Sequence, residues 1–153
     1  MTASEFKIEK RQPIHAAIVR GSALKADLST AFAVSFGKVF STLATQGVAP
    51  ISMPFVRYPA MGDTVAFEAG AMVADPFKGA NDVVGIEFAG GDVATAIHAG
   101  PYEDLPATHE ALIAWLGQQG RHASGPPWEE YIDDPGQVSD PANVRTRVSY
   151  PLS

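Results

Sequence analysis

The stretch Gln46-Gly47 is followed by Met53-Pro54-Phe55-Val56-Arg57-Tyr58, and Gln119-Gly120 is followed by Pro126-Pro127-Trp128-Glu129-Glu130-Tyr131. The second stretch lies a constant 73 residues after the first. In both stretches, the glycine ends a predicted helix, and the motif Pro-aromatic-x-x-Tyr opens a predicted strand. Where the first copy has Val56, the second has Glu129. The sequence therefore predicts an internal duplication, with a site on the axis between two halves.

The pattern around the first copy predicts a β-α-β-β unit. Apolar residues at ~100° per residue favour a helix over 27–46, which Gly47 ends. The buried stripe of this helix is expected to be Leu28, Phe32, Phe36, Val39, Phe40 and Leu43. We expect strands over 14–20, which ends at Gly21, over 54–58 and over 64–73.

The pattern around the second copy predicts the same unit again. Gly90-Gly91-Asp92 between two apolar runs indicates a hairpin of strands 83–88 and 93–98. A helix is expected over 104–119, with Pro106 tolerated in its first turn. Its buried stripe is expected to be Leu105, His109, Leu112, Ile113 and Leu116. Strands over 127–132 and 144–150 complete the unit.

Together these elements predict a single α+β domain over residues 1–153, with pseudo-repeats at about 5–75 and 82–153. The duplicated β-α-β-β units are expected to form one antiparallel sheet of about eight strands with both helices on one face.

Composition excludes several classes of protein. The chain has 153 residues, 46% of them hydrophobic, a formal net charge of −6 and no cysteine. The charge opposes nucleic-acid binding, and the missing cysteines remove disulfides and thiolate metal sites. No apolar run is long enough to cross a membrane, and the N-terminus from Met1 to Glu5 lacks the pattern of a secretion signal. We therefore expect a cytoplasmic protein that binds no cofactor.

Glu129 is the strongest candidate for chemistry. Side chains alternate along a strand, so Glu129 and Tyr131 share one face, whereas Glu130 belongs to the other and is expected to be solvated. A buried carboxylate needs a partner, which a tyrosine hydroxyl or a ligand cation can supply. The alternative is a structural Glu129 that is hydrogen-bonded inside the fold.

Other candidates each have a structural alternative. Tyr58 and Tyr131 occupy equivalent places and can either cage a cation or pack in the core. Glu68 is either a second acid of the site or a residue paired with Arg57 or Arg20. Trp115 and His98 can line a site, but such residues are more often structural. No histidine pair has ligand spacing near a carboxylate, so we expect no metal site.

Several motifs resemble one known family. His98-Ala99-Gly100-Pro101-Tyr102, the strand from Trp128 into Asp134-Pro135, and Pro151-Leu152 are similar to the marks of GyrI-like small-molecule-binding domains, the effector-binding domain family of AraC-type regulators. Pro54-Phe55-Val56-Arg57-Tyr58 and Phe67-Glu68-Ala69-Gly70 match it too, so the resemblance covers the whole chain. The chain departs from the family at Ala89-Gly90-Gly91-Asp92, where Pro-Gly-Gly-Arg is usual.

The resemblance implies a central cleft that binds bulky, aromatic or cationic small molecules over a Glu at its floor. The ligand-binding residues we expect are Glu129, Tyr131, Tyr58, Glu68, Trp115, His98 and Phe55. Few residues precede the domain, so we expect no attached DNA-binding segment and no direct nucleic-acid contact. The partners we expect are a small-molecule ligand, together with a second copy or a separate regulator.

Three functions remain open from the sequence. The preferred one is a stand-alone binding protein for drugs or effectors. The second is a hydrolase of electrophilic small molecules, in which Glu129 acts as general acid or base and Tyr131 or Tyr58 orients water or an oxyanion. The third, a gyrase-inhibitor type of interaction module, has no distinctive surface pattern to support it.

Overall fold

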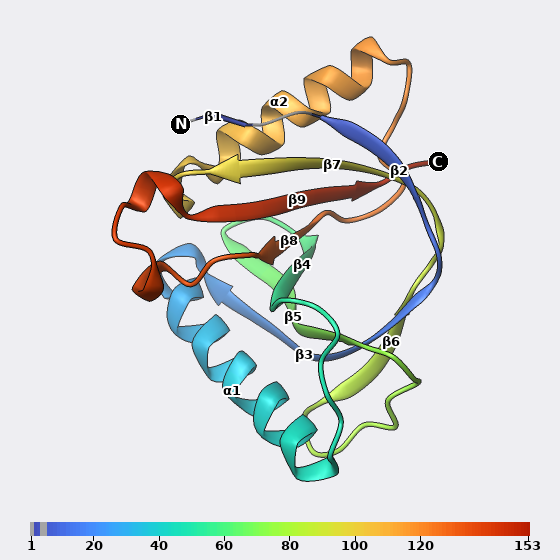
Figure 1. The fold of residues 1–153 in the computed structure, drawn as a ribbon, viewed down its shortest axis with the longest axis vertical. Coiled ribbons are helices and arrows are strands. Elements are labelled where there is room, and N and C mark those ends of the chain that lie inside the picture. The colour runs from blue at the N-terminus through green and yellow to red at the C-terminus, as the bar shows by residue number, and fades with distance from the viewer. Residues whose placement is uncertain (1, 4–5) are drawn as a thin grey trace. The chain divides into compact units, whose positions relative to one another are not determined.

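The computed structural model describes residues 2–3 and 6–153 and confirms the predicted α+β class (Figure 1). Antiparallel strands and two long helices make up most of the chain. Part of the N-terminal stretch used to judge a secretion signal, residues 1, 4 and 5, lies outside the described residues. Within the described residues, no helix combines the length and the apolar character needed to cross a membrane.

The chain divides into two compact units. We call residues 12–90 the central unit, and residues up to 11 together with 91–153 the terminal unit. These boundaries differ from the predicted repeats at two strands. The strand over residues 7–11 precedes the central unit but belongs to the terminal unit, and the strand over residues 84–88 belongs to the central unit.

The central unit contains four strands and one helix. The chain runs through β3 (Ile14–Leu24), the 3₁₀ turn η1 (Lys25–Asp27), α1 (Leu28–Gln46), β4 (Phe55–Ala60), β5 (Thr64–Val73) and β6 (Val84–Phe88). The strand order is β4-β5-β3-β6, and all neighbours are antiparallel. This arrangement contains the predicted β-α-β-β unit and adds β6 at one edge.

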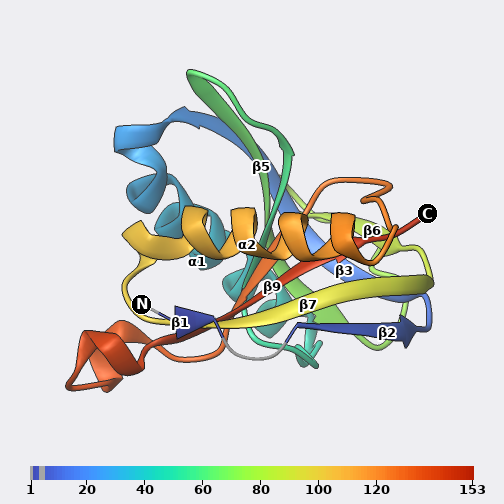
Figure 2. The same cartoon turned by 90° about the horizontal axis from the view of Figure 1, so that it is seen from above.

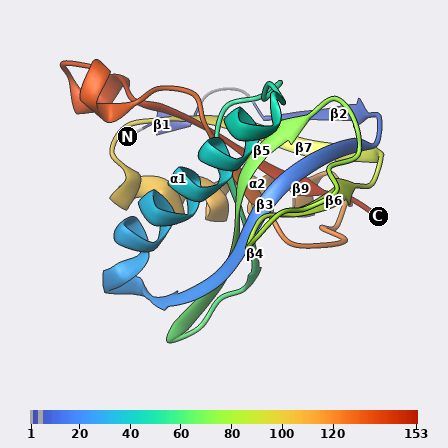
Figure 3. The ribbon, with the colours of Figure 1, turned by 90° about the horizontal axis from the view of Figure 1, so that it is seen from below.

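Helix α1 packs against β3 and β5, alongside which it runs in Figure 3. Val39 and Leu43 are buried in a cluster with Ala17, Val19 and Val73. Gly47 has φ +68° and its N–H caps the helix, as predicted. The helix is therefore fixed by its apolar stripe and by a glycine that can adopt the left-handed conformation.

Strand β3 continues past Gly21, where the sequence predicted it to end. Gly21 pairs with Phe67 on β5, and a Cβ at Gly21 would come within 2.7 Å of the Phe67 ring. The Phe67 ring also packs edge-to-face on Phe32, with centroids 5.0 Å apart. The glycine thus makes room for a neighbouring aromatic ring and does not break the strand.

In its described residues, the terminal unit contains five strands and one long helix. Its elements are β1 (Thr2–Ala3), β2 (Lys7–Arg11), β7 (Gly91–Ala99), η2 (Tyr102–Asp104), α2 (Leu105–Gln118), β8 (Trp128–Tyr131), η3 (Pro135–Gln137), η4 (Pro141–Asn143) and β9 (Arg145–Pro151). β9 lies between β8 and β7, and both β1 and β2 pair with the other edge of β7. Figure 2 shows α2 running along β7 and β9.

Helix α2 buries one face against β7 and β9. Leu105, Leu112 and Leu116 pack with Ala94, Ala96 and Val148. Pro106 lies in the first turn, as predicted. The prediction that Ile113 is buried is wrong, because its side chain is 44% exposed. Thr108, which the predicted stripe did not include, is buried on the same helix. Ile113 lies one residue past Leu112, about 100° around the helix, which is enough to reach solvent.

The predicted hairpin of 83–88 and 93–98 is wrong. β6 pairs with β3, whereas β7 pairs with β2, a strand the sequence did not predict. The pairing of β2 runs from Lys7 opposite Thr95 to Arg11 opposite Gly91. Gly91 has φ +132°, a backbone conformation that glycine adopts easily, at the start of β7.

Candidate functional site

Glu129 lies on the face of β8 that looks toward α2. It pairs across the strands with Val148, which packs against the apolar face of α2. Only 5% of Glu129 is exposed. A carboxylate buried at this depth needs hydrogen-bond donors.

Three polar side chains form a row with Glu129. The Tyr131 hydroxyl donates to Oε1 of Glu129 at 2.9 Å. Nε2 of His109, on α2, lies 2.7 Å from Oε2 of Glu129. Nδ1 of His109 lies 2.7 Å from the hydroxyl of Tyr150, on β9. We call Tyr150, His109, Glu129 and Tyr131 the Glu129 row.

Tyr150 of the Glu129 row and Tyr102 beside the row keep their protons at neutral pH. Burial and the charge of Glu129 raise the pKa of Tyr150 to about 12. Burial, and then the charges of Asp134, Glu129 and Asp133, raise the pKa of Tyr102. The Tyr102 ring packs against Tyr131 at 5.6 Å between centroids. Two tyrosines with raised pKa values thus lie one contact away from Glu129, Tyr150 through His109 and Tyr102 through Tyr131.

Alternation along the strand predicted that Glu129 and Tyr131 share a face, but it did not point to His109 and Tyr150. His109 was placed only in the buried stripe of a helix. Tyr150 shares a strand face with Val148, so alternation along β9 could have placed it beside Glu129. The contact from His109 depends on how α2 is rotated over the strands, which a single sequence does not specify.

Glu130 was expected to be solvated, and this is wrong. It is buried on the opposite face of β8, where Trp128 Nε1 donates to it at 3.3 Å. Arg147 lies 3.4 Å and Arg11 3.9 Å from its oxygens. Alternation assigned its face correctly, but cations on β9 and β2 let the carboxylate stay buried there.

Glu68 holds two arginines in the central unit. The Nε atoms of Arg57 and Arg20 donate to its two oxygens at 2.5 Å and 3.0 Å. Burial alone would raise the pKa of Glu68, but the two arginines outweigh it and the pKa is lowered. Of the two alternatives from the sequence, the contacts match the ion-paired one.

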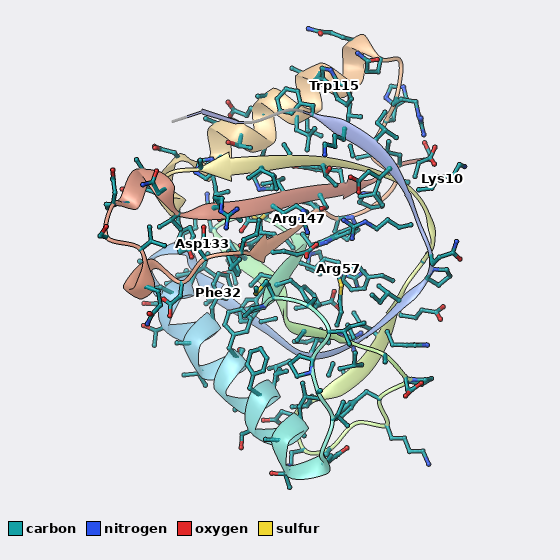
Figure 4. All side chains as sticks on the ribbon, in the orientation of Figure 1. Lys10, Phe32, Arg57, Trp115, Asp133 and Arg147 are labelled. Carbon is teal, nitrogen blue, oxygen red and sulfur yellow. The ribbon has the colours of Figure 1, made fainter. Side chains whose placement is uncertain are left out.

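The two units carry the same cross-strand ion pair with the charges exchanged. Arg57 on β4 faces Glu68 on β5, and Glu130 on β8 faces Arg147 on β9. Figure 4 labels both arginines on their strands. The 73-residue offset relates Arg57 to Glu130, so the repeats share this position in the ladder. Glu129 replaces Val56, which is buried and apolar.

The remaining candidates in the terminal unit have structural contacts. His98 is fully buried, with its ring nitrogens 2.6 Å from Thr108 Oγ1 and 3.0 Å from the Pro101 carbonyl oxygen. Trp115 packs against the core cluster of α2 and lies 5.6 Å from the Phe6 ring. These contacts place both side chains in the packing of α2.

In the central unit, Phe55 is fully buried on β4 and packs edge-to-face on Phe88 at 5.3 Å. Tyr58 is half-buried on the same strand, with its ring 6.3 Å from that of Phe32. A role for Phe55 or Tyr58 in ligand binding stays a prediction.

A separate cavity of about 500 Å³ lies on the strand face away from α2. Its walls are Lys7, Glu9, Arg11, Thr95, Ala96, Ile97 and Arg147, so it does not include Glu129. Its two arginines face Glu130, and Arg11 also faces Glu9. Among the described residues, no group of three His, Asp or Glu side chains is arranged to hold a metal ion.

Comparison with known proteins identifies the family. The family described as GyrI-like small molecule binding domain matches residues 4–153. No curated protein matches the chain. The fold is similar to that of EcmrR, in a cryo-EM complex with DNA (TM-score 0.82, 18% identity, 97% of this chain and 57% of that chain) and in the crystal structure of its C-terminal domain (0.80, 16%, 97% and 97%). The chain thus spans little more than half of EcmrR in that complex.

Two further structures share the fold at low identity. One is SAV2435 bound to tetraphenylphosphonium (TM-score 0.66, 11% identity, 97% of this chain and 94% of that chain). The other is a hydrolase from Listeria innocua (0.65, 11%, 97% and 92%). Because the family match spans nearly the whole sequence, this chain belongs to the GyrI-like small-molecule-binding domain family.

Proposed function

We propose that this GyrI-like domain binds bulky aromatic cations and that Glu129 anchors their positive charge. The observation that carries the proposal is the buried carboxylate of Glu129 among the rings of Tyr131, Tyr150 and His109. Aromatic faces attract cations, and a desolvated carboxylate adds a strong attraction at short range.

The family and one relative support this ligand class. Small-molecule binding is the shared property of the family. SAV2435, with the same fold, is bound to tetraphenylphosphonium, a lipophilic aromatic cation. Tyr102 is 40% exposed and touches Tyr131, so it offers a ring by which a ligand can approach the row.

Calorimetry with tetraphenylphosphonium tests the proposal directly. Glu129→Gln removes the charge with little change in shape and should weaken binding about tenfold to a hundredfold, because a charge-assisted contact contributes roughly 1.5–3 kcal/mol. Glu110→Gln, at an exposed position on α2, is the matched control and should bind as the parent does. Equal affinities for parent and Glu129→Gln would remove Glu129 as the anchor.

The ligand's charge can be separated from its shape. Tetraphenylborate has a similar shape and the opposite charge, so the parent should bind it more weakly than the phosphonium. Glu129→Gln should narrow that difference. A parent that prefers the borate would contradict the proposed ligand class.

A second function, hydrolysis of an electrophilic small molecule, is favoured by the short contact between Glu129 and His109. A carboxylate beside an imidazole can take and return a proton, so Glu129 could act as a general base with Tyr131 orienting water. A hydrolase from Listeria innocua has the same fold. Turnover decides between the two: a binding protein leaves such electrophiles intact in mass spectrometry after long incubation.

A further inference from the structure

The Glu129 row can hold its protons in two ways without breaking a contact. With neutral His109, the Tyr150 hydroxyl donates to Nδ1 and Nε2–H donates to Glu129. With cationic His109, Nδ1–H donates to the Tyr150 oxygen instead. The distances of 2.7 Å on both sides of the ring fit either arrangement. His109 can therefore gain or lose one proton while Glu129 keeps its donor.

The surroundings of His109 make Glu129 its counter-ion. Strand β8 presents Glu129 and, beyond it, Tyr131, and β9 presents Tyr150. Strand β7 contributes His98, whose ring nitrogens are held by Thr108 and Pro101; Glu110, next to His109 on α2, is exposed. Among the described residues, Glu129 is the ion-pair partner of His109.

A ligand cation and a protonated His109 would compete for the same carboxylate. Histidine changes its charge between about pH 5 and 8. Two cations close to one buried carboxylate repel each other strongly, because water screens them little there. Binding of the ligand should then drive the proton off the imidazole.

We propose that His109 is the residue that sets the charge selectivity of this site, by giving up its proton when a cationic ligand binds at Glu129. The inference rests on the proposed function and specifies its regulation. The proton on Nε2 or Nδ1 passes to solvent, His109 becomes neutral, and the ligand supplies the positive charge beside Glu129. Neutral ligands of the same shape bind without this exchange.

The exchange makes cation affinity depend on pH in one direction. Because each bound cation releases at most one proton, the association constant rises with pH by at most about tenfold per pH unit while His109 is protonated. It levels off once His109 is neutral before binding. The preference for a cation over a neutral ligand of similar shape is therefore greater at pH 7.5 than at pH 5.5.

The test is calorimetric binding of tetraphenylphosphonium to the full chain at pH 5.5–7.5. At each pH, two buffers with different ionisation enthalpies give the number of protons released. The parent should release a substantial fraction of one proton at the acidic end. His109→Gln keeps an amide donor but cannot titrate, so its proton release and the pH dependence of its affinity should vanish. His122→Gln, at an exposed position of the same unit, should behave as the parent.

The outcomes separate this inference from the proposed function. If the parent binds no aromatic cation at any pH, the proposed function fails. If it binds the cation but releases no proton, or if His109→Gln releases as many, the exchange is wrong and the binding function stands. Triphenylphosphine oxide, a neutral ligand, should bind without proton release; release with this ligand also contradicts the exchange.

A second measurement does not depend on the folding of a variant. Imidazole ¹⁵N NMR of the parent at pH 5.5 reports the protonation of each histidine. Saturating tetraphenylphosphonium should shift one histidine from the cationic to the neutral form, and the signal should be that of His109. Unchanged protonation of His109 on binding would overturn the proposal.

Discussion

Replacing Glu68 by Gln should destabilise the central unit by about 2–3 kcal/mol at pH 7. Glu68 is on β5 and pairs with Arg20 on β3 at one side and with Arg57 on β4 at the other. One carboxylate therefore joins three strands. Removing one partner of a fully buried pair costs roughly 3–5 kcal/mol because the remaining charge is stranded. Arg20 is 60% exposed and can regain water, whereas Arg57 is 23% exposed and lies 4.6 Å from the Phe88 ring, which lowers the figure only in part.

The effect should depend on pH in a defined direction. The pKa of Glu68 is lowered from the ordinary 4.5, since the contacts with Arg57 and Arg20 outweigh the effect of burial. A lowered pKa in the folded state means that the stabilisation is complete above about pH 4.5 and is lost as the pH falls through the folded-state pKa. The difference between parent and Glu68→Gln should therefore be largest at neutral pH and shrink in acid.

Urea denaturation followed by circular dichroism at pH 7 and at pH 3.5 measures this difference. In thermal denaturation at pH 7, the melting temperature of Glu68→Gln should lie roughly 4–10 °C below that of the parent. Glu87→Gln, on β6 of the same unit, is the control: its side chain is 58% exposed and lies 3.9 Å from His15, so the change should stay within about 0.5 kcal/mol. A Glu68→Gln variant as stable as the parent at pH 7, or equally destabilised at both pH values, would contradict this role of Glu68.

Two further predictions concern glycine positions and alkaline stability. Gly70→Ala should prevent folding of the central unit, because the new Cβ would overlap the carbonyl oxygen of Ala17. Gly37→Ala, in an open position of α1, should instead raise the free energy of unfolding by about 0.5–1 kcal/mol. Soluble yield and the urea midpoint check both variants. The pKa of Tyr150 is raised from 10.0 to about 12, so unfolding is favoured as pH rises over that interval, and Tyr150→Phe should lose less stability than the parent between pH 9 and pH 11. If the parent and Tyr150→Phe lost the same amount of stability over this pH range, ionisation of Tyr150 would not be the cause of the loss.

Local signals in the sequence predicted much of the secondary structure. Gly47 ends α1 with a positive φ, and Pro106 opens α2, because these residues have strong backbone preferences of their own. Alternation along β8 put Glu129 and Tyr131 on one face, and the two are hydrogen-bonded. Such features depend on residues close together in the chain.

Features that depend on distant partners could not be predicted in the same way. β2 is a charged segment whose strand conformation comes from pairing with β7. The contact of His109 with Glu129 joins a helix and a strand. Glu130 is buried because Arg11 and Arg147 lie beside it. In each case the deciding group lies elsewhere in the sequence, so neither periodicity nor propensity reveals it.

β2 precedes the central unit in the chain but pairs within the terminal unit, and this arrangement affects the order in which the protein can fold during synthesis. Its partner β7 begins only at Gly91, so β2 cannot pair with β7 while the central unit is made. The central unit can close as soon as Phe88 has emerged, whereas the terminal unit must wait for β9. Lys7-Ile8-Glu9-Lys10-Arg11 is well suited to that delay, because charged side chains along an unpaired strand hinder its association with other chains.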